Sequence, residues 1–163
     1  MNNKGFTLME LLVSIFVFAL VVAAASNLFS AAAQAQRRSI ENQKVLDSAR
    51  YVLETIAKAV RMSIIQSSDG TLLTSLQINH ATKGVVTYAL SGGQVTENST
   101  AISSSNVAVD NLYFTVKGVG TTDSLQPRVT IILKIRSTDA IAPMYRASAN
   151  FQTTVSQRNL DLP

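Results

Sequence analysis

Hydrophobic side chains form one long apolar run near the start of the chain. Within residues 11–25 the only polar side chain is Ser14, and with three mild interruptions the apolar character continues to Ala33. A helix of this length can cross a hydrocarbon core of roughly 30 Å at about 1.5 Å per residue. The pattern therefore predicts a membrane-spanning helix over residues 6–33.

The residues that follow keep helical spacing but become amphipathic. No glycine or proline occurs between Phe6 and Asp69, so neither residue type interrupts the helix. We expect the helix to continue to about Ile65, with residues 34–66 as its amphipathic part. Apolar positions recur every three or four residues and predict one face that packs against a sheet: Leu46, Ala49, Leu53, Ile56, Val60 and Ile64.

A second set of positions with the same spacing carries charge. The sign alternates until the last member: Arg37, Glu41, Lys44, Asp47, Arg50, Glu54, Lys58 and Arg61. Intrahelical pairs of this kind contribute about 0.2–0.5 kcal/mol each, so a solvated face explains the pattern without any partner. The alternative is a lateral contact surface for neighbouring protein chains.

Beyond Ser67-Ser68-Asp69-Gly70 the pattern changes to short β-rich runs between polar turns, which predicts a globular domain over residues 67–163. The expected strands are 72–78, 85–90, 94–96, 107–117, 128–136 and 147–155. The Ser91-Gly92-Gly93 segment predicts a hairpin turn.

Four apolar residues of the fifth strand alternate with more polar ones, which predicts one buried face: Val129, Ile131, Leu133 and Ile135. We therefore expect an α+β fold, in which an antiparallel sheet packs against the C-terminal half of a long helix.

The composition leaves little material for catalysis. The chain has no cysteine, which excludes a disulfide, a thiolate metal site and a cysteine nucleophile. The single histidine, His80, is expected at a surface or strand end, so we expect neither an enzyme nor a cofactor. Four aspartates of the sheet region lack the close spacing of a calcium loop: Asp69, Asp110, Asp123 and Asp139.

The net charge of +4 is spread along the chain, so we do not expect a nucleic-acid partner. A DNA-binding role would rest on dispersed basic residues of the sheet region: Lys117, Arg128, Lys134, Arg136 and Arg146.

One acidic residue, Glu10, stands at the start of the apolar run. A carboxylate inside a membrane costs about 2.5 kcal/mol or more on insertion scales, so such an acid needs a partner. A secretory signal peptide cleaved near Ala25 or Ala33 is one alternative, and a plain N-terminal anchor is another. Neither explains an acid at this position, and the basic segment before it is very short for a signal peptide.

Residues 4–14, Lys-Gly-Phe-Thr-Leu-Met-Glu-Leu-Leu-Val-Ser, resemble the prepilin signature that type IV pilins share with type II secretion pseudopilins. The resemblance implies that a prepilin peptidase removes a leader, residues 1–5, by cutting between Gly5 and Phe6, and that Phe6 becomes N-methylated. It also implies that Glu10 neutralises the amine of an adjacent subunit and sets register during filament assembly. Gly5, Phe6 and Glu10 are therefore the candidate site residues.

The same resemblance implies a single-pass protein of the inner membrane, with its C-terminal domain outside the cytoplasm before it joins a filament. Its partners would be the prepilin peptidase, other pilin or pseudopilin subunits and an inner-membrane assembly platform. The charge count gives no support for a cytoplasmic N-terminus, because Lys4 precedes the run whereas Arg37, Arg38 and Lys44 follow it. We therefore base the expected orientation on the motif and not on the charge count.

Residues 151–160 look similar to the last strand and Arg-Asn terminus of minor pseudopilins and minor pilins. The apolar helix after Glu10 looks more like that of the J-type minor pseudopilins of type II secretion than that of the major group, so the chain as a whole most resembles the J type. Two alternatives stay open. One is a minor pilin of a type IV or DNA-uptake pilus, and the other is a secreted or anchored binding domain with a conventional signal peptide.

Overall fold

A computed structural model describes residues 5–120, 125–138 and 145–158 of the chain. It contains one long helix, α1 (Leu8–Arg61), followed in these residues by nine strands. The strands form two antiparallel sheets, which confirms the α+β class. The chain divides into two compact units, Met1–Ser39 and Ile40–Pro163, and each is described here by itself.

The helix ends earlier than the sequence suggested. It stops at Arg61 instead of about Ile65, and Ser63–Ile65 form strand β1. There Ile64 lies opposite Asn79 of strand β3. Two consecutive β-branched residues fit a pleated surface better than a crowded helix, so pairing with a distant strand overrides the helical spacing.

The buried face of the helix is rotated relative to the predicted one. Ala49, Ile56 and Val60 are buried as expected, whereas Leu46 is 38% exposed and Ile64 is 47% exposed. Val45 and Val52 take the remaining core positions on the helix. Adjacent apolar residues on a helix differ by about 100°, so periodicity alone could not decide which of two neighbours faces the sheet.

The predicted single sheet is wrong, because the structure has two. The first has the strand order β1-β3-β4-β5-β6. Beside β1, its strands are β3 (Ser75–His80), β4 (Gly84–Ser91), β5 (Gln94–Glu97) and β6 (Thr100–Ala101). The second has the order β2-β7-β8-β9. Its strands are β2 (Gly70–Leu73), β7 (Val107–Lys117), β8 (Arg128–Ser137) and β9 (Ser148–Ser156).

The predicted strand 72–78 is in fact divided between the two sheets. Leu73 pairs with Phe114 of β7, whereas Ser75 pairs with Ala89 of β4. Leu72 has a φ of 54°, in the left-handed region that few side chains adopt, and the β2 register shifts at this point. This irregularity turns the backbone from one sheet into the other, and the apolar pattern did not reveal it.

Local turn and alternation signals were confirmed. Ser91 pairs with Gln94 across the β4–β5 hairpin, and the two intervening glycines have φ values of 58° and 75°. Positive φ at both central residues is the requirement of a type I′ turn. The four alternating apolar residues of β8 are fully buried.

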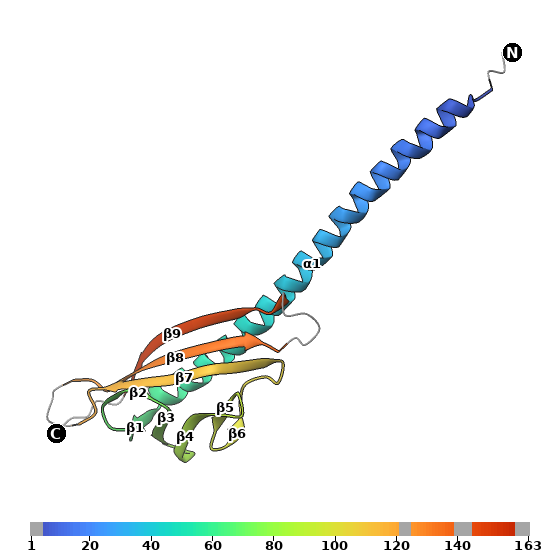
Figure 1. Ribbon diagram of the computed structural model, residues 1–163. Coiled ribbons are helices and arrows are strands. Elements are labelled where there is room, and N and C mark those ends of the chain that lie inside the picture. The colour runs from blue at the N-terminus through green and yellow to red at the C-terminus, as the bar shows by residue number, and fades with distance from the viewer. Residues whose placement is uncertain (1–4, 121–124, 139–144, 159–163) are drawn as a thin grey trace. The chain divides into compact units, whose positions relative to one another are not determined.

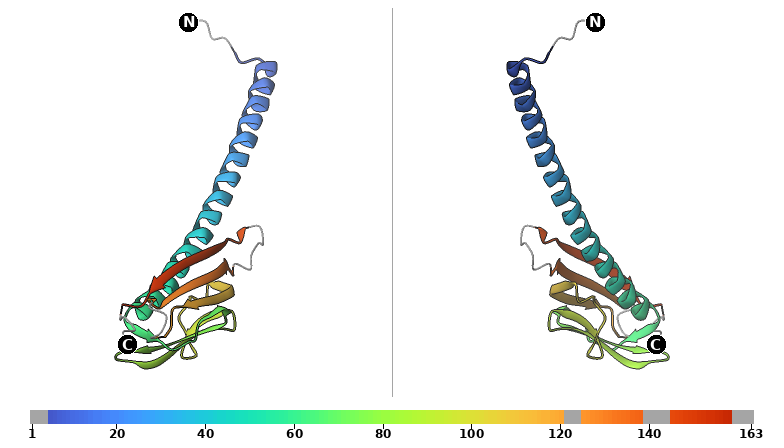
Figure 2. Two further views of the ribbon diagram at one scale, coloured as in Figure 1. Left: turned by 90° about the vertical axis from the view of Figure 1, so that its left-hand side faces the viewer. Right: turned by 90° about the vertical axis from the view of Figure 1, so that its right-hand side faces the viewer.

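One hydrophobic core joins the C-terminal part of α1 to both sheets. Figures 1 and 2 show β7, β8 and β9 side by side across this part of the helix, with the strands of the other sheet beyond β7. Phe114 from β7 and Tyr88 from β4 are among its largest buried side chains. Burial, followed by the nearby Glu97 carboxylate, raises the pKa of Tyr88 to about 12.

Candidate functional site

The helix begins with a capping arrangement built around Glu10. The backbone N–H of Glu10 donates to the Thr7 Oγ1 atom at 3.2 Å, and the Thr7 hydroxyl lies 3.5 Å from Glu10 Oε2. The backbone N–H of Leu11 donates to the Thr7 carbonyl at 3.1 Å. Thr7-Leu8-Met9-Glu10 has the Thr-x-x-Glu spacing of a capping box, a signal that the sequence reasoning missed. Glu10 therefore has a structural role at the helix start, even within a single chain.

The predicted cleavage position lies immediately before this cap. Gly5 and Phe6 are exposed and precede the first helical residue, Leu8. A Cβ atom added to Gly5 would meet no atom within 4 Å. Packing within the described chain therefore does not require glycine here. A peptidase that binds the backbone at close range would require it, because glycine has no Cβ atom.

Two serines in the apolar helix satisfy their hydroxyls locally. Ser14 donates to the Glu10 carbonyl at 2.7 Å, and Ser26 donates to the Val22 carbonyl at 2.8 Å. Such back-bonding removes most of the cost of placing a hydroxyl in an apolar environment. Glu10 is the one charged side chain in residues 6–33, so its carboxylate is the dominant polar group of this segment.

Large apolar side chains of this segment are uncovered in the isolated chain. Phe16 is 65% exposed and Phe18 is 68% exposed, and the described residues up to 40 are all exposed. By length and composition, α1 can cross a membrane. A continuous apolar surface of this extent indicates contact with lipid or with other proteins.

The charged helix face is largely exposed, with one exception. Glu41 is only 4% exposed, although the alternating pattern placed it on a solvated face. Its Oε1 atom forms an ion pair with Lys44, and Oε2 has no hydrogen-bond partner among the described residues. The alternating charge pattern gave no signal of this burial.

The aspartates do not gather into one site. Asp69 accepts hydrogen bonds from the backbone N–H groups of Val119 and Gly118, at 2.9 and 3.0 Å, and these bonds hold its pKa below the usual value. Asp110 lies 2.7 Å from the Nε atom of Arg136. The two remaining candidates, Asp123 and Asp139, lie outside the described residues. Within the described residues no group of three or more potential metal ligands occurs.

Four of the five basic residues considered for DNA binding share the outer face of the β7–β8 sheet. Lys117 lies opposite Arg128 in the cross-strand register, and Lys134 and Arg136 follow at alternate positions along β8. Arg146 instead precedes strand β9. The ion pair with Asp110 offsets the charge of Arg136.

A comparison with family models supports the reading of the first segment. The model described as the prokaryotic N-terminal methylation motif matches residues 1–26, which include Gly5, Phe6 and Glu10. Neither the curated proteins nor the solved structures include a match to the chain. The motif supports a type IV pilin-like subunit, and it implies processing by a prepilin peptidase and assembly with other pilin-type subunits.

Proposed function

We propose that the chain is a non-enzymatic minor pseudopilin of the J type, which enters a type II secretion pseudopilus or a related type IV filament. The observation that carries this proposal is the methylation motif at residues 1–26, together with an apolar helix whose residues up to 33 are exposed in the described structure. Residues 1–5 would be the leader, residues 6–33 the filament-core helix, and residues 34–66 the part that packs with the β-rich domain, residues 67–163.

Cleavage after Gly5 would preserve the structure of the helix start. The cut leaves Thr7 as the second residue of the mature chain, so the hydroxyl that accepts the Glu10 N–H remains in place. It also creates a cationic, N-methylated amine on Phe6, about one helical turn from the Glu10 carboxylate. Processing would thus supply a cationic partner for the Glu10 carboxylate and would leave the Thr7 capping hydroxyl in place.

The new amine and Glu10 favour ordered packing of subunits. Either charge alone in an apolar environment is costly, whereas a pair offsets much of that cost. A pair between neighbouring helices forms at one axial offset only, so it selects register more than it adds stability. The apolar face that lipid covers before assembly would then contact other helices in the filament core.

The sheet domain would lie outside the cytoplasm and contact other minor subunits or cargo. The exposed members of the charged helix face, such as Arg50 and Glu54, would provide lateral contacts between subunits. The inner-membrane assembly platform and the prepilin peptidase would be transient partners before the subunit enters the filament.

The decisive experiment is to determine the mature N-terminus. The chain would be co-expressed with a prepilin peptidase and analysed by intact-mass and terminal-peptide mass spectrometry. We expect a chain that begins at N-methylated Phe6, and no cleavage in Gly5→Ala. Because the site around Gly5 is open, alanine fits the chain itself, so lost cleavage would reflect the peptidase. A terminus near Ala25 or Ala33 would instead establish a conventional signal peptide.

The alternative of a minor pilin from a DNA-uptake pilus rests on one observation. Lys117, Arg128 and Lys134 lie on one face of the sheet, where a phosphate backbone could reach them together. Binding of labelled DNA to the full chain in non-ionic detergent should then weaken steeply with salt, and should weaken further in K117Q/R128Q. Salt-independent binding, or no binding, would remove this alternative.

A further inference from the structure

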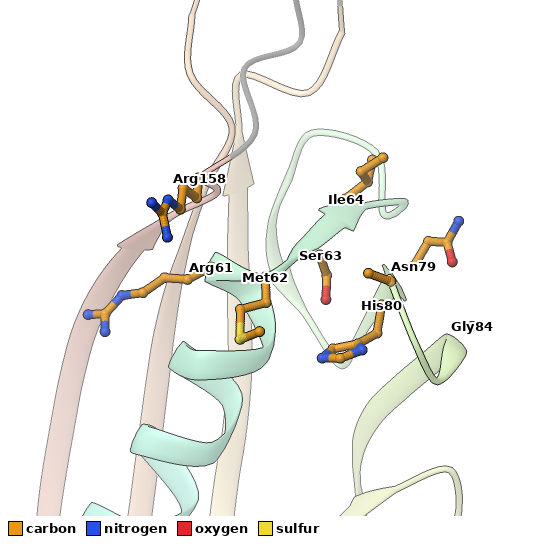
Figure 3. Close-up of a pocket in the computed structure, with 9 residues that line it drawn as sticks. Arg61, Met62, Ser63, Ile64, Asn79, His80, Gly84 and Arg158 are labelled. Atoms are coloured by element: carbon orange, nitrogen blue, oxygen red, sulfur yellow. The ribbon is translucent and has the colours of Figure 1, made fainter.

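A cavity of about 630 Å³ opens at the point where α1 ends and β1 begins. Residues from five places in the chain line it: the helix end, β1, the end of β3 with the turn after it, the start of β4, and the segment after β9 (Figure 3). They include Arg61, Met62, Ser63, Asn79, His80 and Arg158. No acidic side chain lines it among the described residues, so the cavity has a positive character.

Two arginines provide this character. The backbone N–H of Arg158 donates to the carbonyl of Arg61 at 3.3 Å, which fixes the two residues as neighbours. In Figure 3 both guanidinium groups extend to the same side of the helix end. Neither has an acidic partner among the described residues. The helix C-terminus contributes only about half a negative charge, so the arginines determine the sign of the local potential.

Uncommitted hydrogen-bonding groups line the part of the cavity that Figure 3 shows on the other side of the helix end from these charges. Ser63 is 4% exposed, yet its hydroxyl has no partner in the described structure. Its cross-strand neighbour is His80, whose Nδ1 accepts from the backbone N–H of Thr82 at 3.3 Å. In the neutral ring the proton then lies on Nε2, which can donate. A buried hydroxyl without a partner is costly, and a bound acceptor would remove that cost.

Apolar surface completes the lining. Met62 and Ile64 are 56% and 47% exposed, although they follow directly on the buried helix face. A small inorganic anion would satisfy the charges but leave these side chains in water. A peptide that carries a carboxylate next to an apolar side chain would satisfy both kinds of surface.

We infer that this cavity is a docking site for an acidic peptide segment of another filament subunit. Carboxylates of that segment would bridge Arg61 and Arg158, since guanidinium groups bind carboxylates in paired, charge-assisted hydrogen bonds. A neighbouring apolar side chain would cover Met62 and Ile64. The identity of the partner as a filament subunit rests on the proposed function, whereas the preference for an acidic peptide rests on the cavity alone.

The test uses the full chain in non-ionic detergent micelles and fluorescein-labelled peptides, with binding followed by fluorescence anisotropy. The probe is Gly-Glu-Leu-Glu-Leu-Gly. Gly-Gln-Leu-Gln-Leu-Gly lacks its charge, Gly-Glu-Ser-Glu-Ser-Gly lacks its apolar groups, and inorganic phosphate serves as a competitor. The site variant is R61Q/R158Q. Its control, K117Q/R128Q, also removes two positive charges, but from the outer face of the β7–β8 sheet.

We expect R61Q/R158Q to lower the affinity for the Glu-Leu peptide by about tenfold or more, which corresponds to about 1.4 kcal/mol. The K117Q/R128Q control should change the affinity for the Glu-Leu peptide less than twofold. The Gln-Leu and Glu-Ser peptides should both bind the wild type more weakly than the Glu-Leu peptide does. An equal loss in both variants would show general charge attraction and overturn the proposal. Equal binding of the Glu-Ser peptide, or full competition by millimolar phosphate, would reveal a simple anion site and also overturn it.

The proposed function can fail separately from this site. Cleavage after Gly5 without peptide binding would refute only the docking site. Peptide binding in a chain processed near Ala25 would leave the acidic-peptide site standing and refute the filament subunit as its partner.

Discussion

The side-chain carbonyl oxygen of Gln157 accepts a hydrogen bond from the backbone N–H of Ile65 at 2.8 Å, across 92 residues of sequence. Gln157 is 1% exposed, and its own backbone N–H donates to the Pro127 carbonyl at 2.8 Å. One side chain thereby joins the strand after the helix to the segment after β9. Next to it, Arg158 makes the backbone contact with Arg61 that shapes the arginine-rich cavity.

Replacement of Gln157 by leucine should destabilise the sheet domain. The change leaves the buried N–H of Ile65 without its acceptor, which costs about 1–3 kcal/mol. Urea unfolding of the full chain in detergent, followed by tyrosine fluorescence, measures this loss. Gln152→Leu is the matched control, because Gln152 is exposed on β9, the strand that directly precedes Gln157. Equal midpoints for the two variants would show that the buried contact contributes no stability.

Loss of Asp69 should change how stability depends on pH. Hydrogen bonds from the backbone N–H groups of Val119 and Gly118, aided by the Lys117 charge, outweigh the effect of burial and lower the pKa of Asp69 from 3.8. A carboxyl whose pKa is lower in the folded state stabilises the fold above the unfolded-state value, and this contribution disappears as the pH falls through the folded-state pKa.

We therefore expect the wild type to exceed Asp69→Asn in urea midpoint at pH 6, with a gap that closes as the pH falls below about 3.8. Asp47→Asn, on the exposed helix face, controls for the loss of one acidic charge. A gap that stays constant from pH 6 to pH 2.5 would contradict the assignment.

The rotated helix face can be tested with two alanine substitutions. Ile56 is fully buried, so Ile56→Ala should lower the free energy of unfolding by about 2–5 kcal/mol. Leu46 is 38% exposed, so Leu46→Ala should lower the free energy of unfolding much less. Comparable losses at both positions would favour the face that the sequence pattern alone predicted. Chemical denaturation of the full chain in detergent provides the measurement.

Glu10→Gln separates the capping role of this residue from a charge role. Glutamine also fits a capping box, so the helix start and the cleavage after Gly5 should be preserved. The negative charge is lost, so incorporation into filaments should fall by about tenfold or more, because an unpaired amine is left in the apolar core. Sheared filaments, quantified by immunoblot against the membrane fraction, measure incorporation.

Thr7→Val is the reciprocal control. It removes the capping hydroxyl at a cost of about 1 kcal/mol but keeps the acid. This variant should still enter filaments. Normal assembly of Glu10→Gln, or failure of Thr7→Val alone, would mean that capping and not charge is the function of Glu10.

Local signals made part of this structure predictable. The adjacent glycines at 92 and 93 specify a hairpin through their own backbone freedom, and the alternation in β8 identifies its buried face without any other strand. The first-segment motif was equally local, because Gly5, Phe6 and Glu10 lie within six residues. Its match to a family model rests on the same short stretch.

Features set by distant contacts could not be predicted. The helix end depends on β3, and the N–H of Ile65 depends on Gln157. The division of strand 72–78 depends on which sheet each half meets. The docking cavity combines Arg61, His80 and Arg158, which no sequence spacing relates.

The long separation between Ile65 and Gln157 also fixes an order of events during synthesis. A ribosome adds about 5–20 residues per second, so the 92 additions from Ile65 to Gln157 take roughly 5–20 s. Throughout that interval the N–H of Ile65 has no Gln157 acceptor, and the β8 and β9 strands that cover the helix are made only late in it. The apolar segment, made first, can enter the membrane long before this. Insertion can therefore precede closure of the sheet domain, which waits for a residue made 92 positions after Ile65.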